Sequence, residues 1–236
     1  MTTFVIVHGA WSGAHAWRWI RPRLRAAGHE VFTPSLTGLG ERGHLASPEV
    51  DLDTHIRDVC GVLEFEDLHE VVLVGHSYGG AVVSGAADRL PGRVAHLVCL
   101  DAEVPEDGEA VMDLLPPAER SAYEESARLR GGGWRIPPPV PDPLPAGLDP
   151  DVRWAMSRFL PQPLRTFTQP LALATAEPAF RRTYVLHTEG REGQELPGFV
   201  QRVSDDPGWR VVTFPAGHSA HVTAPGLLAG LLLDMT

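Results

Sequence analysis

The sequence predicts an α/β protein with a mostly parallel sheet flanked by helices, and two observations lead to this prediction. Short, continuous apolar runs at residues 4–7, 71–74 and 94–100 are typical of strands that are buried on both faces. Stretches with helical spacing of apolar residues alternate with these runs. Such alternation favours a parallel sheet, because each helix carries the chain back to the start of the next strand.

The first half of the chain begins with the strand at residues 4–7. A helix is expected at 16–27, where apolar residues recur at helical spacing and a glycine follows as a stop. A short strand is expected at 30–33, and the polar, glycine-rich residues 35–48 indicate a loop. A helix at 51–65 follows, with acidic residues in its first turn, where the helix dipole favours them.

The second half continues the same alternation. The strand at 71–74 precedes a helix at 81–90, and the strand at 94–100 comes next. Valine-rich runs favour strands again near the end of the chain. Two further strands and a final helix are expected at 183–186, 210–214 and about 222–233.

A long segment between the third and fourth apolar runs differs in composition. Residues 131–150 are dominated by glycine and proline, which exclude a central strand or a regular helix there. Helical patterns lie on either side, at about 117–130 and 150–159. Because the segment leaves the sheet at the carboxyl end of a strand, where open α/β sheets hold their ligands, we expect it to form a lid. The expected organisation is one domain, 1–236, with a core of residues 1–104 and 180–236 and a lid insert at about 105–179.

Length and composition are those of one large globular domain: 236 residues, 43% hydrophobic and 21% charged. The 20 basic residues, all arginine, and 30 acidic ones give a net charge of −10 without a basic run, which argues against nucleic acid or a membrane as partner. The absence of lysine excludes Schiff-base and pyridoxal-phosphate chemistry. No signal peptide or membrane-spanning run is visible, so a cytoplasmic location is expected. The oligomeric state is left open, with a homodimer among the alternatives.

The strongest motif is the turn Gly75-His76-Ser77-Tyr78-Gly79-Gly80, which joins an expected strand to an expected helix. A serine on such a sharp turn has strained backbone angles, and glycines two residues before and after it remove side chains that would clash. Its hydroxyl is exposed at a helix N-terminus, whose dipole favours developing negative charge. The motif therefore predicts Ser77 as a nucleophile.

A serine nucleophile needs an adjacent base. His218 follows the last expected strand and precedes the last helix, so it lies on the same rim of the sheet as Ser77. His221 is the alternative, but it falls within the start of the helix, and we expect His218 to be the base. A developing oxyanion needs two backbone N–H groups. We expect these from Ala10, in the turn after the first strand, and from Tyr78, directly after the nucleophile.

Residues 38–43, Gly-Leu-Gly-Glu-Arg-Gly, match the dinucleotide-binding pattern G-x-G-x-x-G. That motif requires glycines that lead from a strand into a helix whose N-terminus holds pyrophosphate, whereas here Pro48 delays any helix. We interpret the segment as a flexible loop near the rim of the site. Two cysteines, Cys60 and Cys99, exclude a disulfide framework and a Cys-based zinc site, and no other metal-ligand spacing occurs. No cofactor and no metal are therefore expected.

Three segments of the chain resemble the α/β-hydrolase fold: VHGAWSGAHAW near the start, the GHSYGG turn, and GHSAHVTAP near the end. Within this fold they are most similar to the branch that holds plant methylesterases, hydroxynitrile lyases and related bacterial esterases. The resemblance covers nearly the whole chain, with the lid least matched. It implies nucleophile Ser77, base His218 and oxyanion donors Ala10 and Tyr78, the same residues that spacing suggests.

Two departures from the family bear on the chemistry. Its lyase members carry a threonine where Gly9 stands and a lysine where Ser219 stands, and those groups help to handle a cyanohydrin, so the resemblance favours ester hydrolysis. The family also places an aspartate close to Gly190, where this chain has none. Glu189 is adjacent, but Asp101 ends a neighbouring strand and can reach the other ring nitrogen of the histidine. We expect Asp101 to be the acid, with Glu189 as the alternative.

Together these residues predict a cofactor-free serine hydrolase that cleaves a carboxylic ester or lactone through an acyl-enzyme. Apolar residues of the lid suggest a small or medium-sized apolar substrate. They are Trp134, Ile136, Leu144, Trp154 and Phe159. Two alternatives stay open: a lyase or another non-hydrolytic enzyme on the same scaffold, and a receptor that binds a small molecule without turnover.

Overall fold

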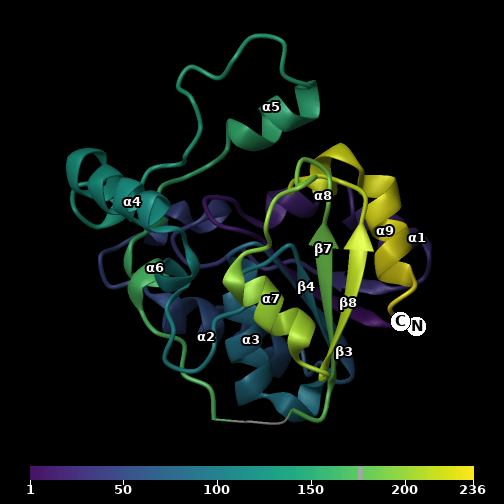
Figure 1. The fold of residues 1–236 in the computed structure, drawn as a ribbon. Coiled ribbons are helices and arrows are strands. Elements are labelled where there is room, and N and C mark those ends of the chain that lie inside the picture. Colours follow the sequence, from purple (N-terminus) through teal and green to yellow (C-terminus); the bar gives the residue numbers. More distant parts are fainter. Residues whose placement is uncertain (175–177) are drawn as a thin grey trace.

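The computed structural model describes residues 1–174 and 178–236. Its main sheet has the strand order β2-β1-β3-β4-β7-β8, and every neighbouring pair is parallel (Figure 1). The strands are β1 (Thr3–Val7), β2 (Glu30–Phe32), β3 (Val71–His76), β4 (Val94–Leu100), β7 (Arg181–His187) and β8 (Trp209–Phe214). Each strand expected from the sequence is present, which confirms the prediction of a parallel α/β sheet.

Helices cover both faces of this sheet (Figure 1). One layer holds α1 (Arg21–Ala26) and α9 (Pro225–Leu233), and the other holds α2 (Leu52–Phe65), α3 (Gly79–Arg89) and α7 (Gly198–Asp205). Successive residues of a strand point to opposite faces, so Phe4 of β1 is buried in the first layer and Val5 in the second. Burial on both faces explains why the strands are continuous apolar runs.

The helix expected at 16–27 is wrong as a continuous element. A 3₁₀ turn occupies Ala14–Trp17, and α1 begins only at Arg21, with Pro22 in its first turn. Proline is well tolerated there because its missing N–H has no partner in the first turn of a helix, so it favours a new start. The loop expected at 35–48 contains a further 3₁₀ helix, Gly40–Leu45, in place of flexible chain.

The final helix is also divided. Residues 222–233 were expected to form one helix, but α8 (Ala220–Thr223) ends before α9 begins. Ala224, between the two, has φ −138° and ψ 49°, outside the helical region. The proline that follows it disfavours helical angles in the preceding residue, which explains the break.

The predicted insert separates β4 from β7. It contains α4 (Pro117–Arg130), β5 (Arg135–Ile136), α5 (Pro150–Met156), β6 (Gln162–Pro163) and α6 (Arg165–Thr168). Figure 1 shows α5 beyond the end toward which the arrowheads of β7 and β8 point, that is, the carboxyl end of the sheet. Of the predicted lid range 105–179, residues 175–177 lie outside the described residues. Within the described part of the chain, no helix is long and apolar enough to cross a membrane.

Candidate active site

Ser77 lies on the turn between β3 and α3. Its φ is +54°, in the left-handed region that non-glycine residues rarely adopt, as the motif predicts. A Cβ at Gly75 would lie 2.5 Å from the carbonyl oxygen of Gly79, and a Cβ at Gly79 would lie 2.8 Å from that of His8. Both glycines are therefore required by close backbone approach, which lets the turn press against the end of β1.

The structure brings His218 and Asp101 together across the rim of the sheet. The Nδ1–H group of His218 donates to Oδ2 of Asp101 over 2.7 Å, from the loop after β8 to the residue after β4. Asp101 has a 1% exposed side chain and, like Ser77, a positive φ, +44°. The expected partner of the histidine is thus Asp101, and no hydrogen bond joins Glu189 to His218 within the described residues.

This contact changes the ionisation of both groups. Burial lowers the pKa of His218, but the hydrogen bond and the negative charge of Asp101 outweigh it, so the pKa is raised above its usual value. Burial raises the pKa of Asp101, but the bond from His218 and nearby positive charge hold it below its usual value. With Nδ1 protonated, Nε2 of His218 is free to accept a proton.

Arg191 is a second partner of Asp101 that sequence reasoning missed. One of its terminal nitrogens lies 2.9 Å from Oδ1 and 3.0 Å from Oδ2 of the carboxylate. Arg191 belongs to the segment after β7, which also contains the alternative acid, Glu189. The sequence places Arg191 close to Glu189, but its partner Asp101 is 90 residues away, so only the fold shows the pair.

Ser77 and His218 line the same cavity, which has a volume of about 200 Å³. No hydrogen bond joins the two side chains in the described structure, and such bonds are often long before a substrate binds. Apolar residues from the turn after β1, from α5 and from α8 complete the wall. The residues that line the cavity on these elements include Ala10, Trp11, Val152, Ala155, Met156 and Val222.

The two expected oxyanion donors are unengaged. Neither the Ala10 nor the Tyr78 amide N–H donates a hydrogen bond to any residue that the structure describes. Ala10 lines the same cavity as Ser77, and Tyr78 follows Ser77 in the chain. The side chain of Tyr78 is fixed by contacts with His55 and Phe167. Its hydroxyl donates to Nδ1 of His55 over 2.8 Å, and its ring stacks on Phe167 at 5.3 Å. Two free amides beside a nucleophile are what a developing oxyanion requires.

The alternative base, His221, lies in the same wall of the cavity but in a different environment. It is buried in α8, its ring packs against Trp17 and His76, and burial lowers its pKa to about 3. No carboxylate contacts it in the described structure. His221 therefore remains a neutral imidazole, whereas His218 has the acid that a general base needs.

Glu103 is a partly buried acid that the sequence pattern did not indicate. It follows Asp101 by two residues, its buried Oε2 has no hydrogen-bond partner among the described residues, and burial raises its pKa to about 7. Its backbone N–H donates to the carbonyl oxygen of Ser77. The main chain of Glu103 thus links the segment after β4 to the turn that carries Ser77. Its carboxyl group adds a titratable group near His218.

Of the five apolar insert residues that suggested an apolar substrate, only Phe159 lines this cavity. Ile136 is fully buried in the core, and the ring of Trp154 packs against Trp19 and the guanidinium groups of Arg18 and Arg158. Large apolar side chains such as Ile136 and Trp154 therefore fill contacts between elements of the insert and the core. The apolar character of the wall comes instead from smaller residues on α5.

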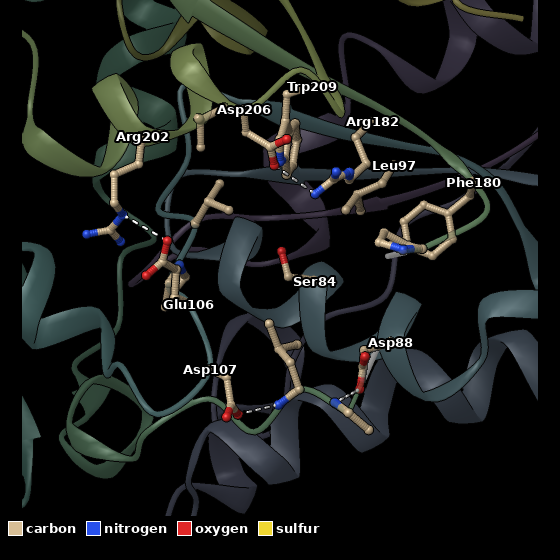
Figure 2. Close-up of a pocket in the computed structure, with 16 residues that line it drawn as sticks. Ser84, Asp88, Leu97, Glu106, Asp107, Phe180, Arg182, Arg202, Asp206 and Trp209 are labelled. Atoms are coloured by element: carbon tan, nitrogen blue, oxygen red, sulfur yellow. Dashed lines mark hydrogen bonds and ion pairs between the residues drawn. The ribbon is translucent and has the colours of Figure 1, made fainter. Parts of the chain in front are cut away.

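A larger cavity, about 450 Å³, lies between α3 and α7 and contains none of the predicted site residues. Figure 2 shows that its charged side chains pair with one another: Arg182 with Asp206, and Arg202 with Glu106. The carboxylate of Asp107 accepts a backbone N–H of the insert, that of Leu173. These charged groups satisfy each other, and no serine–histidine pair lines this cavity among the described residues.

Comparison with known proteins agrees with this geometry. The model of the alpha/beta hydrolase family matches residues 4–231. A carbendazim hydrolyzing esterase of Nocardioides sp. (strain SG-4G) is 41% identical over 97% of both chains. A methylesterase from Arabidopsis has a solved structure with a TM-score of 0.71 at 26% identity, covering 100% of this chain and 98% of that one. An extracellular α/β-hydrolase from a Paenibacillus species, at 24% identity, shares the fold with a TM-score of 0.83 over 99% of this chain and 98% of its own. This chain belongs to the α/β-hydrolase family.

Proposed function

We propose that this protein is a serine esterase that hydrolyses a carboxylic ester of a small, apolar molecule through an acyl-enzyme. The observation that carries the proposal is the shared cavity: a strained serine and a histidine paired with a buried carboxylate meet in one apolar pocket. The likeness to a carbendazim hydrolyzing esterase over nearly the whole chain supports the same reaction class.

In the proposed mechanism, Nε2 of His218 takes the proton of Ser77 as its oxygen attacks the ester carbonyl. Asp101 holds the imidazole by Nδ1 and stabilises the imidazolium that forms. The N–H groups of Ala10 and Tyr78 bind the oxyanion, and the positive end of α3 adds to this field. The alcohol leaves with the proton of His218, and water activated by the same histidine then releases the acid.

The cavity limits the substrate class. A volume of about 200 Å³ with a mainly apolar wall fits a compact ester, and among the described residues no Asp, Glu or Arg side chain lines it. The group beside the reacting carbonyl would contact Met156 and Phe159 of the insert. We therefore propose small neutral esters, including esters with a flat ring, in preference to charged or long-chain ones.

The deciding experiment combines labelling with turnover. Intact mass after exposure to a small fluorophosphonate should show a single adduct on the wild type and none on Ser77→Ala, and only the wild type should hydrolyse a panel of p-nitrophenyl and methyl esters. An adduct without ester turnover would favour a non-hydrolytic enzyme on the same scaffold. Tight binding of the esters without adduct or turnover would favour a receptor.

Two further features are proposed from the sequence: a cytoplasmic location and, as one alternative, a homodimer. Cell fractionation tests the location, and sedimentation equilibrium at micromolar concentration tests the oligomeric state.

A further inference from the structure

The turn that carries Ala10 is held by the insert and not only by its own sheet. The backbone N–H of Trp11 donates to Oε1 of Gln162 over 3.0 Å, and the N–H of Leu160 donates to the carbonyl oxygen of Trp11 over 2.8 Å. The indole N–H of Trp11 donates to the carbonyl oxygen of Ile136 over 3.0 Å. Three hydrogen bonds from the insert therefore converge on one residue of this turn.

Trp11 needs this support because its backbone is strained. Its φ is +61°, a left-handed conformation that costs a bulky residue free energy and persists only where the surroundings impose it. Without a partner for its amide, Trp11 could return to a favoured φ. The preceding residue, Ala10, would then move with it.

Gln162 is buried and its side-chain amide is held in one orientation. Its side chain is 0% exposed, and its Nε2 donates to Oγ1 of Thr166 over 2.7 Å, whose hydroxyl in turn donates to the carbonyl oxygen of Pro163. The chain of bonds fixes which end of the amide faces Trp11, because only the oxygen can accept a backbone N–H. Gln162 does not line the cavity, so it has no contact with a bound ester.

We infer that Gln162 is a positioning residue of the oxyanion site: by binding the Trp11 amide it holds the turn so that the neighbouring Ala10 amide faces the substrate oxygen. The inference rests on the proposed function. Of two successive amides in the turn, one has a buried acceptor and the other has none among the described residues. The insert would thus position an oxyanion donor in addition to covering the pocket.

The main test replaces Gln162 by methionine, which has similar volume and no amide. Loss of a whole oxyanion donor costs roughly 10²–10³-fold in kcat, and a displaced donor should cost part of this, about 10–100-fold. KM should stay within about threefold, since the ester does not touch Gln162. Gln162→Glu keeps an acceptor for the Trp11 amide and should retain more of kcat than Gln162→Met.

Gln169→Met is the matched control. The Oε1 of Gln169 also accepts a backbone N–H from a distant segment, that of Asp53 at 2.8 Å, and neither residue lines the cavity. This variant should lose stability without a change in kcat or KM. Active-site titration corrects each rate for misfolded protein.

A second readout separates positioning from a structural role. A boronic acid that mimics the tetrahedral intermediate should lose affinity for Gln162→Met in parallel with kcat, while a product carboxylate should bind as it does to the wild type. Equal kcat in Gln162→Met and wild type, or equal losses for both ligands, would overturn the inference and leave the esterase proposal intact. A wild type without ester turnover would overturn both.

Discussion

The carboxylate of Asp101 accepts hydrogen bonds from two cationic or potentially cationic groups, His218 on one oxygen and Arg191 on both. Burial alone would favour its neutral form, but these partners keep it ionised. A fixed negative charge beside Nδ1 is what a base needs in order to become a cation during turnover. The properties of His218 therefore depend on how Asp101 divides its attraction between the two partners.

Asp101→Asn should lower kcat by about 10³–10⁴-fold, because an amide neither stabilises the imidazolium nor enforces the required tautomer. Steady-state kinetics on a p-nitrophenyl ester measures the loss, and circular dichroism checks that the variant is folded. Glu189→Gln is the matched control and should keep wild-type turnover. The opposite pattern, in which Glu189→Gln is inactive and Asp101→Asn is not, would make Glu189 the acid.

Arg191→Met should shift the pH profile. The positive charge of Arg191 lowers the pKa of His218, so its removal raises that pKa. The base works only when it is neutral, and activity is lost as the pH falls through its pKa. The acid limb of kcat/KM should therefore move to higher pH, by about 0.5–1 unit. Arg202→Met, which removes an arginine paired with Glu106 and Glu109 away from the site, should leave the limb unmoved.

At the scale of elements, the nucleophile turn depends on how closely β3, α3 and the end of β1 approach one another. The missing side chain at Gly75 leaves room for the carbonyl of Gly79 and a methyl group of Val83. On the other side, α2 supports the turn, because His55 accepts the Tyr78 hydroxyl and donates its other ring N–H to the carbonyl of Thr37. The turn at residues 75–80 is therefore stabilised by α2, which lies outside the sequence motif.

Gly75→Ala should destabilise the fold by about 1–3 kcal/mol, since the new methyl group would lie 2.5 Å from both the Gly79 oxygen and Val83 Cγ2. Gly61→Ala is the control: Gly61 lies inside α2 with no atom within 4 Å of the added Cβ, and alanine there should add up to about 1 kcal/mol. Urea unfolding measures both free energies. A Gly75→Ala variant as stable as wild type would show that the turn can yield.

At the scale of the whole molecule, the core contains histidines that are neutral because they are buried. Burial lowers the pKa of His8 to about 4, of His55 to about 4 and of His221 to about 3. All three lie near the proposed site. His8 ties the turn after β1 to the chain at Leu36, whose N–H donates to its Nε2 over 3.1 Å. The surroundings of the proposed site thus contain histidines whose pKa is low because the folded protein buries them, and unfolding removes this effect.

Stability should fall steeply in mild acid. In the unfolded chain these histidines bind protons below about pH 6.5, whereas in the folded protein they do so only near pH 3–4. Protons therefore favour unfolding as the pH falls through this window, by about 2 kcal/mol per histidine at pH 5. Calorimetry should show Tm lower by at least about 10 °C at pH 5.0 than at pH 7.5. Three or more protons should be taken up on unfolding, because burial also holds the pKa of His76 well below its usual value. An unchanged Tm would mean that the folded histidines already bind protons at pH 5.

The sequence by itself determined the features that depend on near neighbours in the chain. The buried strands, the strained turn at Ser77 and the place of His218 after the last strand follow from patterns within a few residues. The helix starts at Pro22 and Pro225 also follow from local sequence, because proline favours the first turn of a helix. The prediction of longer helices relied on apolar spacing and did not include these prolines.

Tertiary structure alone decided which distant residues meet. Asp101 reaches His218 across 117 positions because only β7 separates β4 from β8 in the sheet. Arg191 returns to the same carboxylate from the segment after β7, and Gln162 reaches Trp11 across 151 positions from inside the insert. No periodicity records such pairs, since they arise from the strand order and from packing of the insert on the rim. The placement of Ser77 and His218 at one cavity was therefore predictable from the sequence, whereas the partners of His218 and of the turn after β1 depended on the fold.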